Sequence, residues 1–283
     1  MKAISDKMKD AGMGSVPVIA GCLVLVAVIV LAVAAPLLTK FDPIQLAPQF
    51  RLRAPTTEFW MGTDMLGRDV WTRVIYGGRV ALLIGASVVV VSLAVGIGIG
   101  LLSGYFPALD KILMRIMDGV MAIPGILLAI ALVSLSGTGV LTVIVAIAVP
   151  EVPRVARLVR GVALSIREEP FVEAAIGVGT PTVKVLWRHI LPNTLAPIIV
   201  QGTYIFAAAM LTEATLSFIG AGPPAEVPTW GNVIADGRAV FQRAPWIILY
   251  PGFFLAATIL SVNVLGDHLR DTLDPRNRGK IAL

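Results

Sequence analysis

The sequence has few of the residues that disulfide-bonded and metal-binding proteins depend on. Cysteine occurs once, at Cys22, and histidine twice, at His189 and His268. One cysteine excludes an internal disulfide framework, and so few cysteines and histidines argue against a Cys/His metal cluster, so no metal site is predicted. Charged residues form 14% of the chain, against roughly 25% in an ordinary soluble domain. A fold surrounded by water is therefore not expected.

Several catalytic motifs are also absent. The sequence contains no GxxxxGK[ST] phosphate loop, no HExxH and no GxSxG elbow. We therefore predict a protein that is not an enzyme and that holds no cofactor of its own. The net charge of +5 would indicate nucleic acid in a soluble protein. In a membrane protein the placement of positive charges matters more than their sum, so no nucleic-acid partner is predicted.

Long apolar runs fill most of the chain. Hydrophobic residues form 57% of it, and the mean hydropathy is +0.85. A bilayer needs about 20 apolar residues per helix. Runs of this kind occupy residues 16–38, 80–105, 116–135, 140–158, 194–219 and 246–265. The AVAA string at 32–35 resembles a signal-peptidase site, but the first run exceeds the ~7–15 residues of a signal core. The sequence thus predicts an all-α polytopic membrane protein with six transmembrane helices.

The connecting segments are expected to be turns and loops. Residues 39–76 are mixed and lie outside the bilayer, residues 107–115 form a short polar turn, and residues 220–244 form a loop. Pro124-Gly125 is expected to kink or break the third span, and Pro150 and Pro153 to interrupt the fourth. The glycines of the second span let membrane helices pack closely. They stand at positions 85, 96, 98, 100 and 104.

Lysine and arginine placement predicts the orientation. Six spans put both termini on one side, together with the 107–115 and 154–190 segments. That side holds 15 basic residues: Lys2, Lys7, Lys9, Lys111, Arg115, Arg154, Arg157, Arg160, Arg167, Lys184, Arg188, Arg270, Arg276, Arg278 and Lys280. The other side holds eight: Lys40, Arg51, Arg53, Arg68, Arg73, Arg79, Arg238 and Arg243. The positive-inside rule therefore predicts cytoplasmic termini.

The longest charge-bearing island between apolar runs is residues 169–193. Phe171, Ala174, Ala175 and Val178 recur at helical spacing, and Gly179 is suited to end the helix. A helix shorter than about 12 residues is marginal alone in water. We interpret it as a docking element for a partner. The alternative is a short amphipathic helix that rests on lipid headgroups.

A few polar residues remain within the expected spans. Glu213 lies deep in the fifth span beside Thr212 and Ser217, where an acid marks either a pathway or a hydrogen bond between helices. Asn263 lines a cavity or bridges helices. Asp118 lies near a membrane face, and Glu151 is assigned to a broken helix near water.

Several strings resemble one transporter family. EAA at 173–175 followed by Gly179 and Leu191-Pro192 resembles the cytoplasmic EAA loop of ABC importer permeases, with His189 at the loop's usual isoleucine position. GTDMLGRD at 62–69, RHILPN at 188–193, LSFIGAG at 216–222, TWG at 229–231 and LGDHLRDTLDPR at 265–276 resemble the second (C-type) permease of its dipeptide, oligopeptide and nickel branch. The resemblance implies the type I ABC importer permease fold.

The resemblance also implies roles and partners. The residues expected to couple to an ATPase are Glu173, Ala174, Ala175, Gly179, Arg188, His189, Pro192 and Asn193. The implied partners are a sister permease, two cytoplasmic ATP-binding subunits that hold ATP and Mg, an extracytoplasmic substrate-binding protein and membrane lipid. The implied location is a bacterial or archaeal cytoplasmic membrane. The resemblance predicts the following segments: residues 1–77 as tail, first helix and external segment; 78–268 as the transmembrane core with the coupling loop at about 161–193; and 269–283 as cytoplasmic tail.

The predicted function is that of a permease subunit that forms half of the pathway for a peptide or similar solute. Nickel or a metal chelate, an opine, glutathione or another small solute is the alternative cargo. The alternative of another class is an ion-coupled secondary transporter that uses Asp118, Glu151 and Glu213. No internal repeat supports that alternative, and a docking helix would have no role in it.

Overall fold

The computed structural model describes residues 16–273, and within them the fold is a bundle of helices without strands. Its long helices are α2 (Val16–Val33), α4 (Val70–Tyr105), α5 (Pro107–Met121), α6 (Gly125–Ser136), α7 (Val140–Arg167), α10 (Leu191–Phe218) and α12 (Trp246–Leu273). Its short elements are α3 (Ala35–Leu38), η1 (Pro48–Phe50), α8 (Pro170–Gly177), α9 (Thr182–Val185), the π-helical turn η2 (Leu186–Ile190), α11 (Trp230–Gly237) and η3 (Arg238–Val240).

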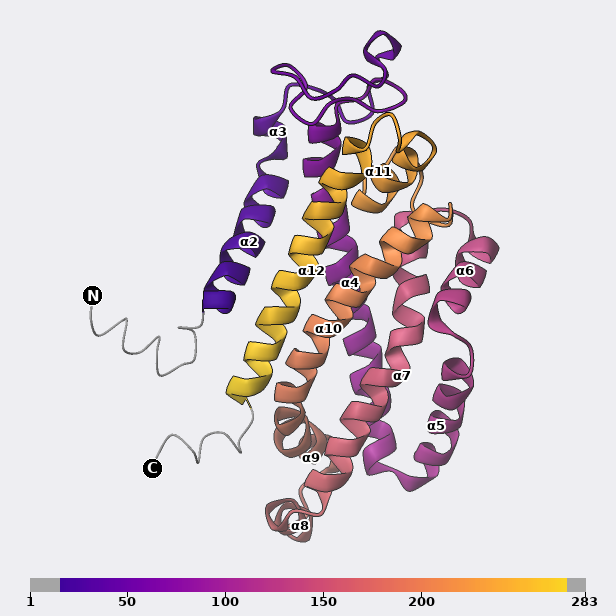
Figure 1. Ribbon diagram of the computed structural model, residues 1–283. Coiled ribbons are helices and arrows are strands. Elements are labelled where there is room, and N and C mark those ends of the chain that lie inside the picture. Colours follow the sequence, from indigo (N-terminus) through magenta and orange to yellow (C-terminus); the bar gives the residue numbers. More distant parts are fainter. Residues whose placement is uncertain (1–15, 274–283) are drawn as a thin grey trace, which may run out of the picture.

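The elements divide between the two ends of the bundle. Segment 39–69 and α11 lie at one end, whereas α8, α9 and the end of α12 lie at the other (Figure 1). Helix α4 packs against α7, α10 and α2, helix α6 packs against α7, and α5 packs against both α4 and α7 (Figure 1). Six of the basic residues used for the orientation lie outside the described residues, as does the 274–276 part of the tail motif: Lys2, Lys7, Lys9, Arg276, Arg278 and Lys280.

Glycines bring α4 and α7 close together. A Cβ added at Gly96, Gly100 or Gly104 would lie 2.5–2.6 Å from side-chain carbons of Val155, Val159 and Ala163. These glycines recur every four residues, so they form one face of α4. The prediction of close helix packing is confirmed at these positions, and Gly85 likewise faces Phe206 and Met210 of α10. Gly98 faces open space.

Four helices within residues 16–273 are long and apolar enough to cross a membrane: α2, α4, the continuous Thr182–Phe218 segment and α12. The pair α5 and α6 would make a fifth span, and it is bent by 88°. Helix α7 has 28 residues, but Glu151, Arg154 and Arg157 fall within its first 18. The chain is a multi-pass helical membrane protein, and the number of six spans stays a prediction.

Two sequence expectations about the third and fourth spans are wrong. Residues 107–115 form the first part of α5 and not a polar turn. Pro107 stands at the start of that helix, where its missing N–H is not needed. Helix α7 runs unbroken through Pro150 and Pro153, so Glu151 does not belong to a broken helix. The expected break at Pro124 is confirmed, since α5 ends at Met121 and α6 begins at Gly125.

Two further boundaries differ from the expectation. The second long helix begins at Val70 and not near Val80, because Asp69 caps it by accepting a hydrogen bond from the Thr72 N–H at 2.8 Å. The segment expected as a loop contains α11, which is capped by Thr229 through the Asn232 N–H at 3.0 Å. Trp230 of α11 is 1% exposed and donates from Nε1 to the Val74 carbonyl at 2.8 Å. Helix α11 is therefore fixed on α4.

Candidate functional site

The loop between α7 and α10 presents a short helix at one end of the bundle. Val172 of α8 is fully buried in the same apolar cluster as Val185 of α9 and Ile190 of η2. It is the one fully buried side chain of α8, and it anchors that helix to the bundle. The loop is therefore attached by one face of α8, and its other face is free of contacts with this chain's core.

The free face of α8 is apolar. Phe171 is 48% exposed and Val178 is 83% exposed, and Ala174 is exposed beside them, whereas Ala175 is half-buried. Val183 and Trp187 extend this exposed apolar surface onto α9 and η2. We call the surface formed by Phe171, Ala174, Ile176, Val178, Val183 and Trp187 the α8 face. An exposed apolar surface of this kind is typical of a site that contacts another protein or lipid.

Gly179 ends α8 as the sequence predicts. Its φ of 79° lies in the left-handed region that glycine adopts at little cost. The Gly179 N–H donates to Ile176 O at 2.9 Å, and the Thr180 N–H donates to Ala175 O at 3.0 Å. These two bonds are those of a Schellman motif, which stops the helix and turns the chain.

The other predicted coupling residues flank this helix. Glu173 lies exposed in the first turn of α8, and Arg188 and Pro192 are exposed. His189 is half-buried with its ring 6.2 Å from that of Phe171, and its carbonyl accepts from Asn193 Nδ2 at 2.7 Å. The structure thus gathers the predicted coupling residues at one end of the molecule.

The candidate pathway residues lie on two helices and form no single cluster: Thr212, Glu213 and Ser217 on α10, and Asn263 on α12. Glu213 is 1% exposed, and its Oε1 accepts from Ser217 Oγ at 2.8 Å and from Thr229 Oγ1 at 2.7 Å. Thr229 is the cap of α11, so Glu213 joins α10 to α11. Thr212 is half-buried next to it on α10, and Asn263 is half-buried on α12. Glu213 and Ser217 therefore form one buried unit with Thr229.

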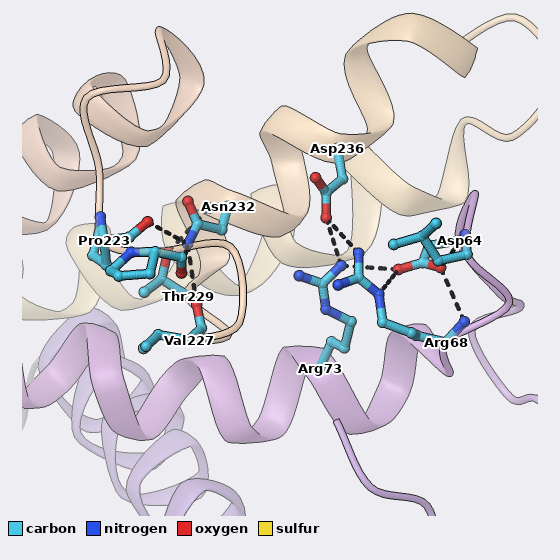
Figure 2. A network of polar contacts seen from close by, with 10 residues as sticks. Asp64, Arg68, Arg73, Pro223, Val227, Thr229, Asn232 and Asp236 are labelled. Atoms are coloured by element: carbon cyan, nitrogen blue, oxygen red, sulfur yellow. Dashed lines mark hydrogen bonds and ion pairs between the residues drawn. The ribbon is translucent and has the colours of Figure 1, made fainter. Parts of the chain in front are cut away.

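Sequence reasoning missed a buried charge cluster at the same end as α11. Asp64 Oδ2 pairs with Arg68 Nε at 2.6 Å and with Arg73 Nη1 at 2.9 Å. Asp236 of α11 pairs with Arg68 Nη2 at 2.8 Å and with the same Arg73 nitrogen at 2.7 Å. Figure 2 shows both arginines lying between the two carboxylates. We call these four residues the Asp64 cluster, and they join the segment before α4 to α11.

The GTDMLGRD string builds this cluster locally. Asp64 Oδ1 accepts from the N–H groups of Leu66 and Arg68 at 2.8 and 2.9 Å, which fixes the turn. Burial raises the pKa of the Asp69 carboxyl, while its hydrogen bonds from Thr72 act in the opposite direction. The sequence did contain a pattern that indicates such a site: three charges within the eight residues of GTDMLGRD, next to a long apolar run.

Asn232 stabilises the loop beside the Asp64 cluster. Its Nδ2 lies 3.2, 3.2 and 3.0 Å from the carbonyl oxygens of Pro223, Pro224 and Val227 (Figure 2). The amide thus holds the proline-containing loop against α11. Next to it, a cavity of about 510 Å³ is lined by residues of this loop together with Asp236 and Arg238.

Comparisons with known proteins give the family. The family model described as "Binding-protein-dependent transport system inner membrane component" matches residues 96–279, more than half of the chain. The chain is 51% identical over 248 residues to a probable peptide ABC transporter permease protein, y4tQ, of Sinorhizobium fredii, with 88% of this chain and 85% of that protein covered. It is 43% identical over 259 residues to the dipeptide transport system permease protein DppC of Alkalihalophilus pseudofirmus, covering 91% and 85%.

Two less similar proteins are also components of ABC transporters. The glutathione transport system permease protein GsiD of Pectobacterium atrosepticum is 38% identical over 263 residues, covering 92% of this chain and 87% of that protein. A chain of the MetNI methionine ABC transporter, solved in inward-facing conformations, has a TM-score of 0.59 at 17% identity. That likeness covers 71% of this chain and 96% of the MetNI chain, and it shows the fold. The chain belongs to the family of binding-protein-dependent transport system inner membrane components, as a permease subunit of an ABC importer of the peptide group.

Proposed function

We propose that this chain forms half of the translocation pathway of an ATP-driven importer that takes up peptides. The support comes from two relatives that match nearly the whole length of this chain and are named as peptide and dipeptide permeases. The other half would come from a sister permease. An extracytoplasmic substrate-binding protein would deliver the peptide, and the complex would lie in a bacterial cytoplasmic membrane with six spans per subunit and both termini in the cytoplasm.

The α8 face is the proposed ATPase contact, and it carries the proposal of ATP coupling. It is apolar, exposed and attached to the bundle by Val172 on its other side. An apolar helix face of this size needs a partner or a headgroup surface. Two ATP-binding subunits would hold ATP and Mg, and this chain would receive their motion through α8.

The ion-coupled alternative has less support. It assigns a coupling ion to Asp118, Glu151 and Glu213. Asp118 is paired with Arg157 at 2.6 Å, and Glu151 is paired with Arg154 at 2.9 Å. Glu213 accepts two hydroxyl hydrogen bonds. Each acid therefore has a partner already: Asp118 and Glu151 pair with arginines of α7, whereas Glu213 is bonded to hydroxyls between α10 and α11.

The test is reconstitution of the chain with and without its partners in liposomes. We expect ATP-dependent uptake of a labelled dipeptide by the complete assembly, and neither ATP hydrolysis nor uptake by this chain alone. Competition by unlabelled glutathione and by Ni²⁺ measures the alternative cargoes in the same assay. Uptake by the chain alone, driven by a proton or sodium gradient, would establish the secondary transporter instead.

A further inference from the structure

A ladder of ion pairs lies along the faces of α5 and α7. On α7, Arg154 Nη1 lies 2.9 Å from Glu151 Oε1, and Arg157 Nη2 lies 2.6 Å from Asp118 Oδ1 of α5. The side chains of Arg154, Arg157 and Asp118 are 58%, 46% and 56% exposed. These charges are therefore paired, yet they open outward from this chain.

If α7 is the fourth of the six predicted spans, the ladder lies at membrane depth. Gly96 of α4 touches Val155, the residue next to Arg154. Helix α4 continues for nine more apolar or small residues, to Tyr105, which is about 14 Å at 1.5 Å per residue. In the other direction, Glu151 lies eleven residues from the start of α7, or about 16 Å. For a hydrocarbon core of about 30 Å, the Glu151–Arg154 pair lies near its middle.

A charged pair at this depth does not face lipid. Ionisable side chains within the membrane face a bundle interior or a water-filled cavity, because hydrocarbon gives them no solvation. The exposed side of Arg154 is not covered by this chain. The surface of α7 that bears the pair is therefore turned to water or to another subunit in the assembled transporter.

The helical geometry links this surface to a groove. At 100° per residue, Leu158 lies within about 20° of Glu151 around α7. Leu158 lines a groove of about 610 Å³ together with Gln201 and Tyr204 of α10 and Arg270 of α12. Polar side chains from α10 and α12 thus meet Leu158, which lies one helical turn beyond Arg154 along α7. That combination is typical of an aqueous passage.

We propose that the Glu151–Arg154 pair and the neighbouring Arg157–Asp118 pair line the water-filled pathway and keep its charge balanced. The cargo class is a zwitterionic peptide, an assignment that rests on the proposed function. A balanced lining neither traps nor repels a solute that carries both an ammonium and a carboxylate group. Removal of one member of the Glu151–Arg154 pair leaves a single uncompensated charge, which selects among solutes by their net charge.

The first test measures water access in the complete importer. With Cys22 replaced by alanine, Arg154→Cys and Leu158→Cys are treated with a membrane-impermeant charged thiol reagent, and Val26→Cys on α2 serves as the lipid-side control. Val26 is 57% exposed on a helix at the edge of the bundle (Figure 1). We expect labelling at 154 and 158 in an inward-open, nucleotide-free state, and none at 26. Absence of labelling at both 154 and 158 in assembled protein overturns the proposal, because the surface is then covered by another subunit or by lipid.

The second test measures charge selectivity. Uptake of three dipeptides of net charge +1, 0 and −1 is compared in Arg154→Gln, in Glu151→Gln and in the double variant. We expect Arg154→Gln to raise the ratio of cationic to anionic uptake about tenfold, and Glu151→Gln to lower it by a similar factor. The double variant should return to within about twofold of wild type, which also controls for folding.

The outcomes separate this inference from the proposed function. Unchanged ratios in both single variants, in complexes that transport peptides, contradict the assignment of Glu151 and Arg154 to the pathway. A wild-type assembly that transports none of the dipeptides contradicts the peptide function, and the labelling experiment then still decides whether the surface is wet.

Discussion

At the scale of single residues, Asp64 joins the segment before α4 to the start of that helix. Its two oxygens accept four hydrogen bonds, two from backbone N–H groups and two from buried arginines. Its side chain is 1% exposed, whereas that of Asp236, on the other side of the arginines, is 34% exposed. Water can compensate for a lost charge at Asp236 but not at Asp64. The two carboxylates therefore form a matched pair for mutation.

We predict that Asp64→Asn destabilises the protein more than Asp236→Asn does. Removal of one partner from a buried ion pair costs about 3–5 kcal/mol, because the remaining charge is left without compensation. At Asp236 solvent screening reduces this cost. The measurement is the thermal stability of each detergent-solubilised variant, with the amount in the membrane as a second readout. Equal losses for the two variants would show that the burial difference does not control the stability of the cluster.

We predict that Glu213→Leu lowers uptake strongly, whereas Glu213→Gln keeps most of it. Both hydrogen bonds of Glu213 end on one oxygen, and a glutamine can place its amide oxygen there. Leucine leaves the hydroxyls of Ser217 and Thr229 buried without that acceptor, at about 1–3 kcal/mol each. This loosens α11 and, on our proposal, the outer end of the pathway. Uptake per molecule in the membrane is the readout, and an equal loss in both variants would instead assign the carboxylate charge to the pathway.

At the scale of elements, α8 shows how a helix end is encoded by one residue. Gly179 has a φ of 79°, while Gly177, two residues earlier, is the last helical residue and has an ordinary φ. A Cβ at either position would meet no atom within 4 Å. Any difference between substitutions at the two glycines therefore comes from backbone conformation and not from a steric clash.

We predict that Gly179→Ala uncouples the importer while Gly177→Ala does not. A left-handed alanine costs roughly 1–2 kcal/mol, so the chain relaxes by extending or tilting α8 and displaces the α8 face. Alanine at position 177 favours the helix that is already present. The measurements are membrane abundance, ATPase co-purification and dipeptide uptake. Glu173→Lys, at an exposed position, should impair the same coupling with normal abundance. Normal ATPase binding and uptake in Gly179→Ala would separate the Schellman turn from coupling.

The elements differ in how far the sequence could predict them. Apolar length alone locates α2, α10 and α12, and the helical spacing that starts at Phe171 locates α8 together with Gly179. Helix α5 is hidden because Asp110, Lys111 and Arg115 resemble a polar turn. Asp110 is in fact paired with Arg160 on α7, at 2.5 and 2.7 Å, and that partner is 50 residues away. A charge that is neutralised by tertiary contact cannot be recognised from its own segment.

The site shows the same limit. The docking loop is local in sequence, so its helix, its terminating glycine and its exposed apolar face could be predicted. The contacts of Glu213 with Thr229 and of Arg73 with Asp236 join segments that are 16 and 163 residues apart. Both depend on α11, whose eight residues lie among prolines and glycines and are fewer than the roughly 11–18 residues in which helical periodicity is recognised. The motif GTDMLGRD marked one half of the Asp64 cluster, and nothing near Asp236 marked the other.

At the scale of the whole molecule, the most extensive helix contact is that of α4 with α7. Helix α4 carries the Asp64 cluster at its start, and α7 leads into α8 at its end, so this contact links the two ends of the bundle. Small residues at a helix contact let backbones approach closely, which supplies the packing that membrane helices need in place of a hydrophobic driving force. The stripe Gly96, Gly100 and Gly104 provides this approach.

We predict that Gly100→Leu abolishes assembly and that Gly98→Leu leaves it intact. A Cβ at position 100 would lie 2.6 Å from Val159 Cβ and 2.7 Å from the Ala156 carbonyl oxygen, so the helices must separate and disturb both ends of the bundle at once. Overpacking by a few heavy atoms costs typically 1–3 kcal/mol or more. At Gly98 nothing lies within 4 Å, and leucine is a good helix former and compatible with lipid. Because both variants add the same side chain only two residues apart, on different faces of α4, membrane insertion is matched between them. The measurement is abundance together with co-purification of the ATPases, and a Gly100→Leu chain that still binds ATPases and transports peptide would show that α4 and α7 can move apart without loss of coupling.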